Sequence, residues 1–254
     1  MIEPSIGSGA FIVPVVERLL ASAALHRATP DELCNSLFGM DLQPVHVATC
    51  RSKVTTTLLE HGFDECDAES LTANWLREGD FLLDDVPGDA DFVIGNPPYI
   101  QLQSLAALTE VLKRQQNYDT YNARGDVYAL FYELGYRLLR PEGVLCFITS
   151  NKWMRAGYGA ELREFLARRT APELLLDFGG IQIFESATVD TNILLFAKRE
   201  PQTATLCATG ENAFECLKKT SVLGGQKVMY MTFQGSRAWT ILSPIEQQIL
   251  QKIE

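Results

Sequence analysis

The sequence predicts an α/β fold in which helices cover a doubly wound, mostly parallel β-sheet. Short apolar segments alternate with longer amphipathic ones through residues 1–200, and this alternation is typical of parallel sheets. Acidic or amide residues follow several of the apolar segments, at the strand ends where the ligands of such sheets bind. The 254 residues, 46% of them hydrophobic, suffice for one sizeable core and an appendage.

The first hundred residues contain four predicted strands and two predicted helices. A strand tail over residues 1–2 runs into the turn Gly7-Ser8-Gly9, and a helix follows to about Leu25. The next strand covers residues 36–42 with Asp41 near its end, and a helix runs through residues 54–59. The third strand lies within residues 73–83 with Asp80-Phe81 at its end, and the fourth covers residues 92–94. The first of these strands is reduced to about residues 1–2.

The second hundred residues continue the alternation. A polar stretch over residues 101–124 precedes an amphipathic helix over residues 127–139, which we expect to stop at Pro141-Glu142-Gly143. The later predicted elements are a strand over residues 144–149, a helix over 158–168, and strands over 173–178 and 191–197.

After Glu200 the pattern becomes weaker. It consists of poorly defined strands, a Gly224-Gly225 turn and a final helix over residues 246–253, which opens with the capping box Ser243-Pro244-Ile245-Glu246. We therefore expect a main domain over residues 1–200 and a separate region over residues 201–254.

Composition excludes several classes of protein. The net charge of −10 argues against a surface that lies broadly on a phosphate backbone. The six cysteines show no metal-ligand spacing, so we expect no metal site and the reduced thiols of a cytoplasmic protein. No apolar run approaches membrane-spanning length, and the N-terminal residues lack the basic region of a signal peptide.

The segment Asn96-Pro97-Pro98-Tyr99 follows a buried apolar strand. Two consecutive prolines fix the backbone and remove its N–H donors, so the segment offers carbonyl acceptors in a rigid arrangement. The Asn96 amide and the Tyr99 ring add a further acceptor and a stacking surface. This combination suits a planar group that carries an NH₂. A turn without chemistry is the alternative interpretation.

The other strand-end residues predict a cationic nucleoside ligand. Glu3, directly before the glycine turn, would repel a pyrophosphate and attract an ammonium or a sulfonium. Asp41 suits ribose hydroxyls, Asp80 can accept a bond from a purine amine, and Phe81 can cover the ring. S-adenosylmethionine has these features and fits better than NAD. Each acid alone is equally compatible with an ordinary cap or strand end.

Together these segments resemble the motifs of γ-class N6-adenine DNA methyltransferases, and in particular the methylase domain of type IIG restriction–modification and phage-exclusion enzymes. The matching segments, in the family's order, are residues 3–11, Gly39-Met40-Asp41-Leu42, Gly79-Asp80-Phe81-Leu82, Asn96-Pro97-Pro98-Tyr99-Ile100, residues 126–131, residues 139–153 and residues 184–189. They span most of residues 1–200, so the resemblance is specific. It implies a Rossmann-like fold that uses S-adenosylmethionine.

The resemblance also assigns roles to residues. It implies cofactor binding by Glu3, Ser5, Gly7, Gly9, Asp41, Leu42, Asp80 and Phe81, methyl transfer at Asn96, Pro97 and Tyr99, and contact with a flipped-out base by Tyr99 and Phe184. The implied partner is double-stranded DNA, with no membrane. An ordinary core role remains the alternative for Phe184. Helix core is favoured over base contact for Tyr128 and Phe131.

Two departures from the family's pattern favour a fragment of a longer enzyme. A further cofactor motif is expected before the first glycine turn, where the first strand, central in the family's sheet, is truncated to about residues 1–2. Only the beginning of a target-recognition region fits after residue 200. Fused nuclease and recognition domains would then lie outside this chain, with much of the basic surface that binds DNA. Lys152, Arg155, Arg163, Arg168 and Arg169 form a locally basic stretch that suits either phosphate contact or a solvated helix face.

Three other functions remain open on these residues. A glutamine amide also carries an NH₂ on an sp² carbon, so protein-glutamine methylation fits the same turn. Methylation of adenine in RNA fits the pocket as well, since nothing in it distinguishes a 2′-hydroxyl. A non-catalytic DNA-binding or partner-binding subunit is the third alternative, and the intact Asn96 and Tyr99 argue against it.

Overall fold

A computed structural model describes residues 1–105, 110–111, 118–184, 189–201, 204–218 and 228–242, together with residues 246, 249 and 252. The expected Gly224-Gly225 turn, most of the capping box and residues 185–188 lie outside these ranges. Within the described ranges, no helix combines the length and apolarity that crossing a bilayer requires.

The described strands form one nine-stranded sheet in the order β3-β2-β1-β4-β5-β7-β6-β8-β9. Their bounds are β1 Ile2–Glu3, β2 Phe38–Asp41, β3 Leu76–Glu78, β4 Ala90–Gly95, β5 Leu139–Ser150, β6 Ala171–Asp177, β7 Thr191–Ala197, β8 Thr205–Thr209 and β9 Met229–Met231. The five strands from β3 to β5 are mutually parallel, while β7 and β9 run antiparallel to their neighbours. The predicted mostly parallel sheet is therefore confirmed, with β1 as a short central strand.

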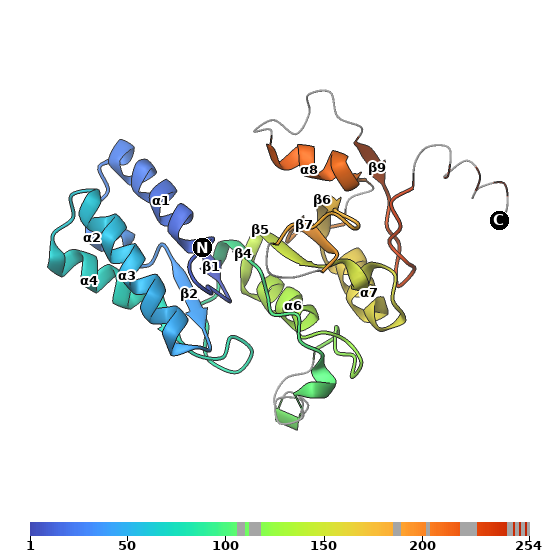
Figure 1. Cartoon of the computed structure of the whole chain (residues 1–254), viewed down its shortest axis with the longest axis horizontal. Coiled ribbons are helices and arrows are strands. Elements are labelled where there is room, and N and C mark those ends of the chain that lie inside the picture. Colours follow the sequence, from blue (N-terminus) through green and yellow to red (C-terminus); the bar gives the residue numbers. More distant parts are fainter. Residues whose placement is uncertain are drawn as a thin grey trace.

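Helices cover both faces of this sheet (Figure 1). Their bounds are α1 Ile12–His26, α2 Pro30–Leu33, α3 Pro44–Glu60, α4 Glu65–Trp75, α6 Tyr128–Leu138, α7 Ala160–Arg169 and α8 Gly210–Lys218. Side chains of α1, α3 and α4 form one buried cluster, and those of α6 and α7 form another. Phe38 of β2 belongs to the second cluster, whereas a Cβ at the adjacent Gly39 would meet Leu76 of the first. The two clusters thus lie on opposite faces.

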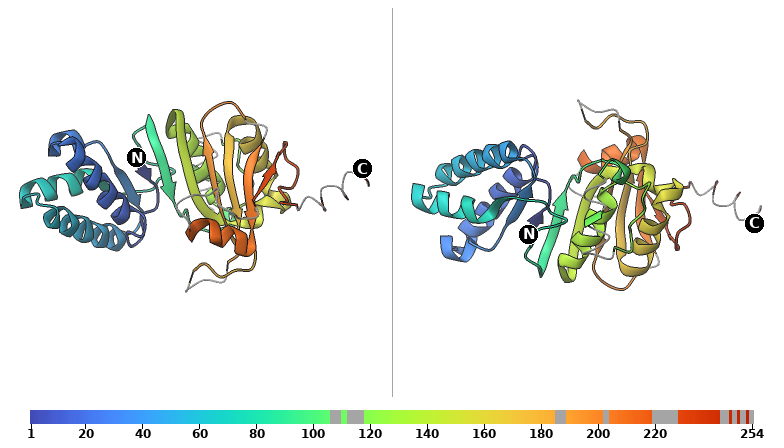
Figure 2. Two further views of the ribbon diagram at one scale, coloured as in Figure 1. Left: turned by 90° about the horizontal axis from the view of Figure 1, so that it is seen from above. Right: turned by 90° about the horizontal axis from the view of Figure 1, so that it is seen from below.

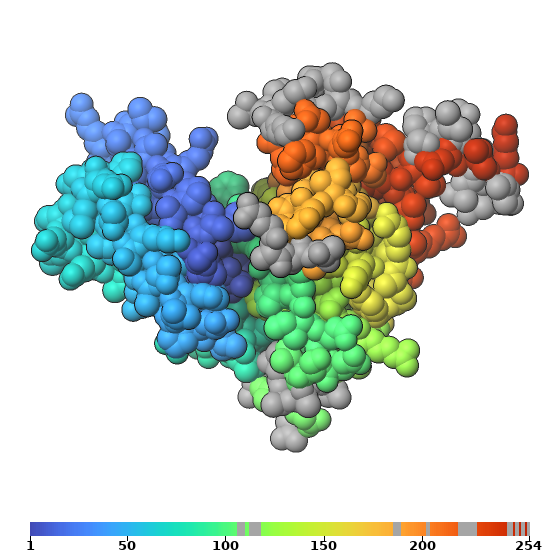
Figure 3. Space-filling view, viewed as in Figure 1, coloured from blue at the N-terminus to red at the C-terminus, as the bar shows by residue number. Residues whose placement is uncertain are grey.

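The sheet extends past residue 200. β8 pairs in parallel with β6, and β9 pairs with β8, so the expected boundary at residue 200 falls within the sheet. Figure 2 shows the sheet running across the molecule from the α1–α4 group to these last strands. Helix α8 covers the end of the sheet through Ala213 and Cys216, which pack on Leu176. The space-filling view shows a notch between the N-terminal helices and α8 (Figure 3).

Three local expectations need correction. Helix α4 was not expected, because its buried face carries only three apolar residues, Ala68, Leu71 and Trp75, beside the polar Thr72. Strand β3 ends at Glu78, so Asp80-Phe81 lies in the turn after the strand and not at its last residues. Strand β5 begins at Leu139 and includes the Pro141–Gly143 segment where we expected a turn, because Lys198 donates to the Gly143 carbonyl and accepts from Glu142.

Candidate active site

A pocket of about 590 Å³ lies at the carboxyl ends of β1, β2 and β4 and beside the turn after β3. The segments after β1, β2 and β3 carry residues that the sequence assigns to cofactor binding, and the remaining lining residues come from the segment after β4 and the start of α6. The lining residues are Pro4, Ser5, Gly7, Asp41, Leu42, Gln43, His46, Gly79, Asp80, Phe81, Leu82, Pro98, Ile100, Ser104, Leu105, Val127 and Phe131. The structure therefore brings together Ser5, Gly7, Asp41, Leu42, Asp80 and Phe81 as the sequence predicts.

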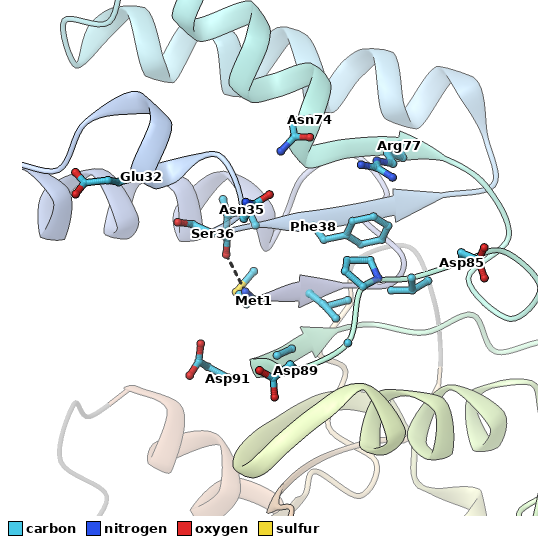
Figure 4. Close-up of a pocket in the computed structure, with 16 residues that line it drawn as sticks. Met1, Glu32, Asn35, Ser36, Phe38, Asn74, Arg77, Asp85, Asp89 and Asp91 are labelled. Carbon is cyan, nitrogen blue, oxygen red and sulfur yellow. Dashed lines mark hydrogen bonds between the residues drawn. The ribbon is translucent and has the colours of Figure 1, made fainter.

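A larger cavity of about 750 Å³ lies at the opposite edge of the sheet, near the amino ends of β1 and β2. Figure 4 shows its polar side chains, among them Glu32, Arg77 and Asp89, and the Met1 ammonium that donates to the Ser36 carbonyl over 2.8 Å. None of the motif residues lines it. Ligands of parallel sheets bind at the carboxyl ends of the strands, so we place the functional site in the smaller pocket.

The glycine loop after β1 adopts a backbone that glycine favours. Gly7 and Gly9 have φ values of +50° and +94°, in the region that other residues rarely adopt. A Cβ on Gly9 would lie 3.2 Å from Val13 Cγ2 and 3.3 Å from Cys50 Sγ. The two glycines therefore allow a tight turn from β1 into α1, and Gly7 lies at the pocket wall.

The carboxylate of Asp41 organises the adjacent wall. Its Oδ2 accepts a hydrogen bond from the Gly7 N–H over 2.9 Å, and its Oδ1 accepts one from the Gln43 N–H over 2.9 Å. His46 Nδ1 lies 3.1 Å from the same Oδ1. A carboxylate has about four lone-pair sites, so one acceptor position remains for a ligand hydroxyl.

Asp80 and Phe81 form the wall beyond Asp41. Asp80 Oδ1 accepts from the Leu82 N–H over 2.9 Å, and burial raises the pKa of Asp80 above its usual range. The Phe81 ring stacks on Phe131 of α6 with centroids 5.0 Å apart. Phe131, predicted as helix core, is buried and also lines the pocket. This part of the pocket suits a flat aromatic ring with an amino group.

Glu3 is fully buried at the end of β1, and neither carboxyl oxygen has a hydrogen-bond partner in the described part of the chain. Burial, with a smaller contribution from Asp41, raises its pKa to about 9. Ionising an isolated buried carboxyl costs much free energy unless a cation compensates the charge. Glu3 does not itself line the pocket, but it immediately precedes Pro4 and Ser5, which do. Its chemistry fits the ammonium or sulfonium of S-adenosylmethionine.

The Asn96–Tyr99 segment lies next to this pocket, which Pro98 lines. Oδ1 of Asn96 is buried and has no hydrogen-bond partner among the described residues. The Tyr99 hydroxyl donates to the Ile148 carbonyl over 3.3 Å, and its ring packs edge-on against Tyr128 at 6.0 Å. Burial raises the pKa of Tyr99 above its usual range. Asn96 therefore holds an unused acceptor on a rigid backbone.

Backbone bonds from the start of α6 hold the end of this segment in place. The Val127 N–H donates to the Ile100 carbonyl over 2.8 Å, and the Leu102 N–H donates to the Gly125 carbonyl over 2.9 Å. The residues around Asp126 therefore support the turn that follows β4.

Phe184 is half-buried in the segment between β6 and β7. Its carbonyl accepts a bond from Gln182 Nε2 over 3.0 Å. No ring contact joins it to Tyr99 within the described ranges, so its role in base contact stays a prediction.

The basic stretch divides into different environments. Arg163 is 4% exposed and donates to the carbonyls of Ser236, Ala156 and Trp153, so phosphate contact is wrong for this residue. Arg155 pairs with the buried Asp177 over 2.7 Å, and Arg168 pairs with Glu164 over 2.6 Å. Arg155 keeps half of its side chain exposed, which leaves it accessible to a ligand.

Comparison with known proteins assigns the family. The model of the Eco57I restriction-modification methylase family matches residues 35–184. Type II methyltransferase M.PaeR7I of Pseudomonas aeruginosa is 32% identical over 213 residues, which is 82% of this chain and 37% of that protein. Type II methyltransferase M.XhoI of Xanthomonas vasicola is 30% identical over 73% of this chain and 35% of its own length. The chain thus spans about a third of the length of these relatives.

Solved structures support the fold. A modification subunit of a putative type I restriction enzyme from Vibrio vulnificus YJ016 has a TM-score of 0.66 at 14% identity, over 98% of this chain and 56% of that one. The type IIG restriction endonuclease BpuSI has a TM-score of 0.57 at 15% identity, over 91% of this chain and 28% of that one. The fold and the sequence matches agree, and this chain belongs to the Eco57I restriction-modification methylase family.

Proposed function

We propose that this chain is the catalytic part of a DNA methyltransferase that transfers a methyl group from S-adenosylmethionine to N6 of a flipped-out adenine. The whole enzyme would act in a restriction–modification or phage-defence system. The observation that supports this proposal most directly is the buried Oδ1 of Asn96, which has no partner in the described part of the chain. Asn96 directly precedes Pro97-Pro98, and Pro98 lines the pocket that suits the cofactor.

An adenine amine is a poor nucleophile because its lone pair is delocalised into the ring. Asn96 Oδ1 and the Pro97 carbonyl would accept its two N–H bonds, so the lone pair would be localised and aimed. Positioning and electrostatics would then supply most of the catalysis. S-adenosylmethionine supplies an electrophilic methyl group on a sulfonium. N6 would gain this methyl group while the S–C bonding pair stays on sulfur, which leaves as a neutral thioether, and N6 would release one of the two protons that Asn96 Oδ1 and the Pro97 carbonyl accept in hydrogen bonds.

The base must leave the double helix to reach Asn96, since base chemistry inside a duplex is sterically blocked. Tyr99 would stack on the extruded base, because its ring position is held by the bond to Ile148 and by Tyr128. Phe184 would contact the base from another side. The extruded state would be favoured because Asn96 Oδ1, a buried acceptor without a partner among the described residues, would gain a hydrogen bond.

The relatives are longer than this chain, and they include the type II restriction enzyme and methyltransferase RM.Eco57I of Escherichia coli. We propose that residues outside this chain carry target recognition. Double-stranded DNA is the proposed partner.

Asn96→Ala tests the proposal in the intact protein. We expect methyl transfer to DNA to collapse, while the affinity for S-adenosylmethionine stays close to that of the wild type, because Asn96 lies outside the cofactor pocket. Labelled methyl is followed into DNA, RNA and protein supplied separately. Retained turnover by Asn96→Ala would contradict the catalytic role. Transfer to RNA or to protein glutamine would favour the corresponding alternative.

A further inference from the structure

One face of α3 is directed at the glycine loop after β1 and at Asp41. His46, Cys50 and Lys53 are spaced at i, i+4 and i+7, so they lie on the same side of the helix. Each makes a polar contact with the glycine loop or with Asp41. Val47, Cys50 and Val54 belong to the buried core, whereas His46 is half-buried and Lys53 is exposed. Cys50 therefore packs in the core and also contacts the glycine loop, with the more exposed His46 and Lys53 on either side of it along the helix.

Both backbone polar groups of Gly7, its N–H and its carbonyl, are hydrogen-bonded. Asp41 Oδ2 accepts its N–H over 2.9 Å, and Cys50 Sγ lies 3.2 Å from its carbonyl oxygen as the donor. Burial, and next the nearby Glu3, raise the pKa of the Cys50 thiol to about 11, so the S–H proton needed for this bond is retained at neutral pH. Cys50 also lies under Gly9, where a Cβ would meet its sulfur at 3.3 Å.

The other two side chains extend the same arrangement. Lys53 Nζ donates to the Ser8 carbonyl over 2.6 Å. His46 Nδ1 lies 3.1 Å from Asp41 Oδ1, and His46 itself lines the pocket. If Asp41 is ionised, Nδ1 carries the proton and donates it. His46 thereby fixes the orientation of the carboxylate that also holds Gly7.

We propose that His46, Cys50 and Lys53 form a positioning face on α3 that holds the Gly7–Ser8 backbone and the Asp41 carboxylate in the arrangement that binds the cofactor. The inference rests on the proposed cofactor pocket and adds the residues that preorganise it. Preorganisation lowers the cost of binding without any new ligand contact. These residues are positioning residues, and the chemistry at Asn96 does not involve them.

The test uses His46→Ala, Lys53→Met and their combination in the intact protein. Both side chains are at least partly exposed, so these variants are expected to fold. Each lost hydrogen bond should weaken binding of S-adenosylmethionine about three- to tenfold, and the double variant should lose more than either single one. The conservative variants His46→Asn and Lys53→Arg keep a donor and should restore most of the affinity.

His61→Asn is the matched control. His61 caps the far end of α3 and contacts the Thr57 carbonyl, roughly 22 Å along the helix from His46. It should leave cofactor affinity unchanged. In kinetics, the positioning variants should raise KM for the cofactor with little change in kcat. Their thermal midpoints without cofactor should match the wild type, whereas the increase on adding cofactor should be smaller.

The outcomes separate the inference from the proposed site. Equal affinities of the wild-type protein and the double variant for S-adenosylmethionine would overturn the positioning face, and the assignment of the pocket would stand. A loss of affinity that His46→Asn and Lys53→Arg do not rescue would also overturn it. Wild-type protein that does not bind S-adenosylmethionine would overturn the pocket assignment and the inference together.

Discussion

The backbone N–H of Gly7 donates to Oδ2 of Asp41 over 2.9 Å. Together with the Ile6 N–H, which donates to the Met40 carbonyl over 3.1 Å, this bond ties the loop after β1 to the end of β2, the adjacent parallel strand. Asp41 therefore shapes the glycine loop and also faces the pocket. A carboxylate placed in this way can bind ribose hydroxyls while it holds the backbone beside them.

Asp41→Ala should weaken S-adenosylmethionine binding about 10- to 100-fold, because hydrogen bonds to a charged group contribute about 1.5–3 kcal/mol. Isothermal titration calorimetry measures the loss. Glu78→Ala is the matched acidic control: Glu78 is exposed at the end of β3, opposite Asp41 in register, and does not line the pocket. An equal loss in both variants would show that net charge, and not the Asp41 contacts, determines affinity.

Glu3 gives the protein a pH-dependent stability. Its pKa is about 9 in the folded protein and 4.5 as the ordinary value. Between these values the folded protein retains a proton that the unfolded chain has released, so the free energy of unfolding decreases as pH rises through this window. The slope is at most about 1.4 kcal/mol per pH unit.

Glu3→Gln removes this titration. Between pH 6 and pH 8 the wild-type protein should lose up to roughly 3 kcal/mol more stability than Glu3→Gln, measured by urea unfolding without cofactor at both pH values. The variant should also bind S-adenosylmethionine more weakly, because the glutamine cannot release a proton to become the carboxylate that a bound cation would stabilise. Parallel pH profiles for the two proteins would contradict the buried, protonated state of Glu3.

Gly9→Ala tests the glycine loop. At a φ of +94° an alanine is strained by about 1–3 kcal/mol, and its Cβ would press on Val13 and Cys50. We expect lower stability together with a loss of cofactor affinity. Gly62→Ala, at a φ of +88° with no atom near its Cβ, is the control: it should lower stability in thermal unfolding and leave cofactor affinity unchanged.

The sequence predicted β2 and β4 well, because each is a compact apolar segment followed by a polar residue, whereas β3 ends two residues earlier than expected. Asp41 ends β2 and Asn96 follows β4 as expected. The reversed direction of β7 was not predictable, because strand direction follows from pairing with β5 and β6 and not from local pattern. Strands β8 and β9 were too weakly patterned to be assigned to the sheet.

Side-chain roles followed the sequence less closely. His46 was missed, although its position five residues after Asp41 places it on the first turn of α3 above that carboxylate. Arg163 looked like a basic surface residue, whereas three backbone carbonyls hold it in the interior. Phe131 was predicted as core, and it is also a pocket wall. The His46 contact could have been found from its spacing to Asp41 at the start of a helix, whereas the bond from Arg163 to Ser236 joins segments 73 residues apart and no local pattern encodes it.

We propose that Asn96 Oδ1 and the Pro97 carbonyl accept the two N–H bonds of the adenine N6 amine. The most direct test incubates the intact protein with duplex DNA and labelled S-adenosylmethionine, digests the DNA to nucleosides and identifies the labelled one by chromatography and mass spectrometry. We predict label in N6-methyldeoxyadenosine, and none when Asn96→Ala replaces the wild type. Label in N4-methyldeoxycytidine, or equal labelling by Asn96→Ala, would contradict the account.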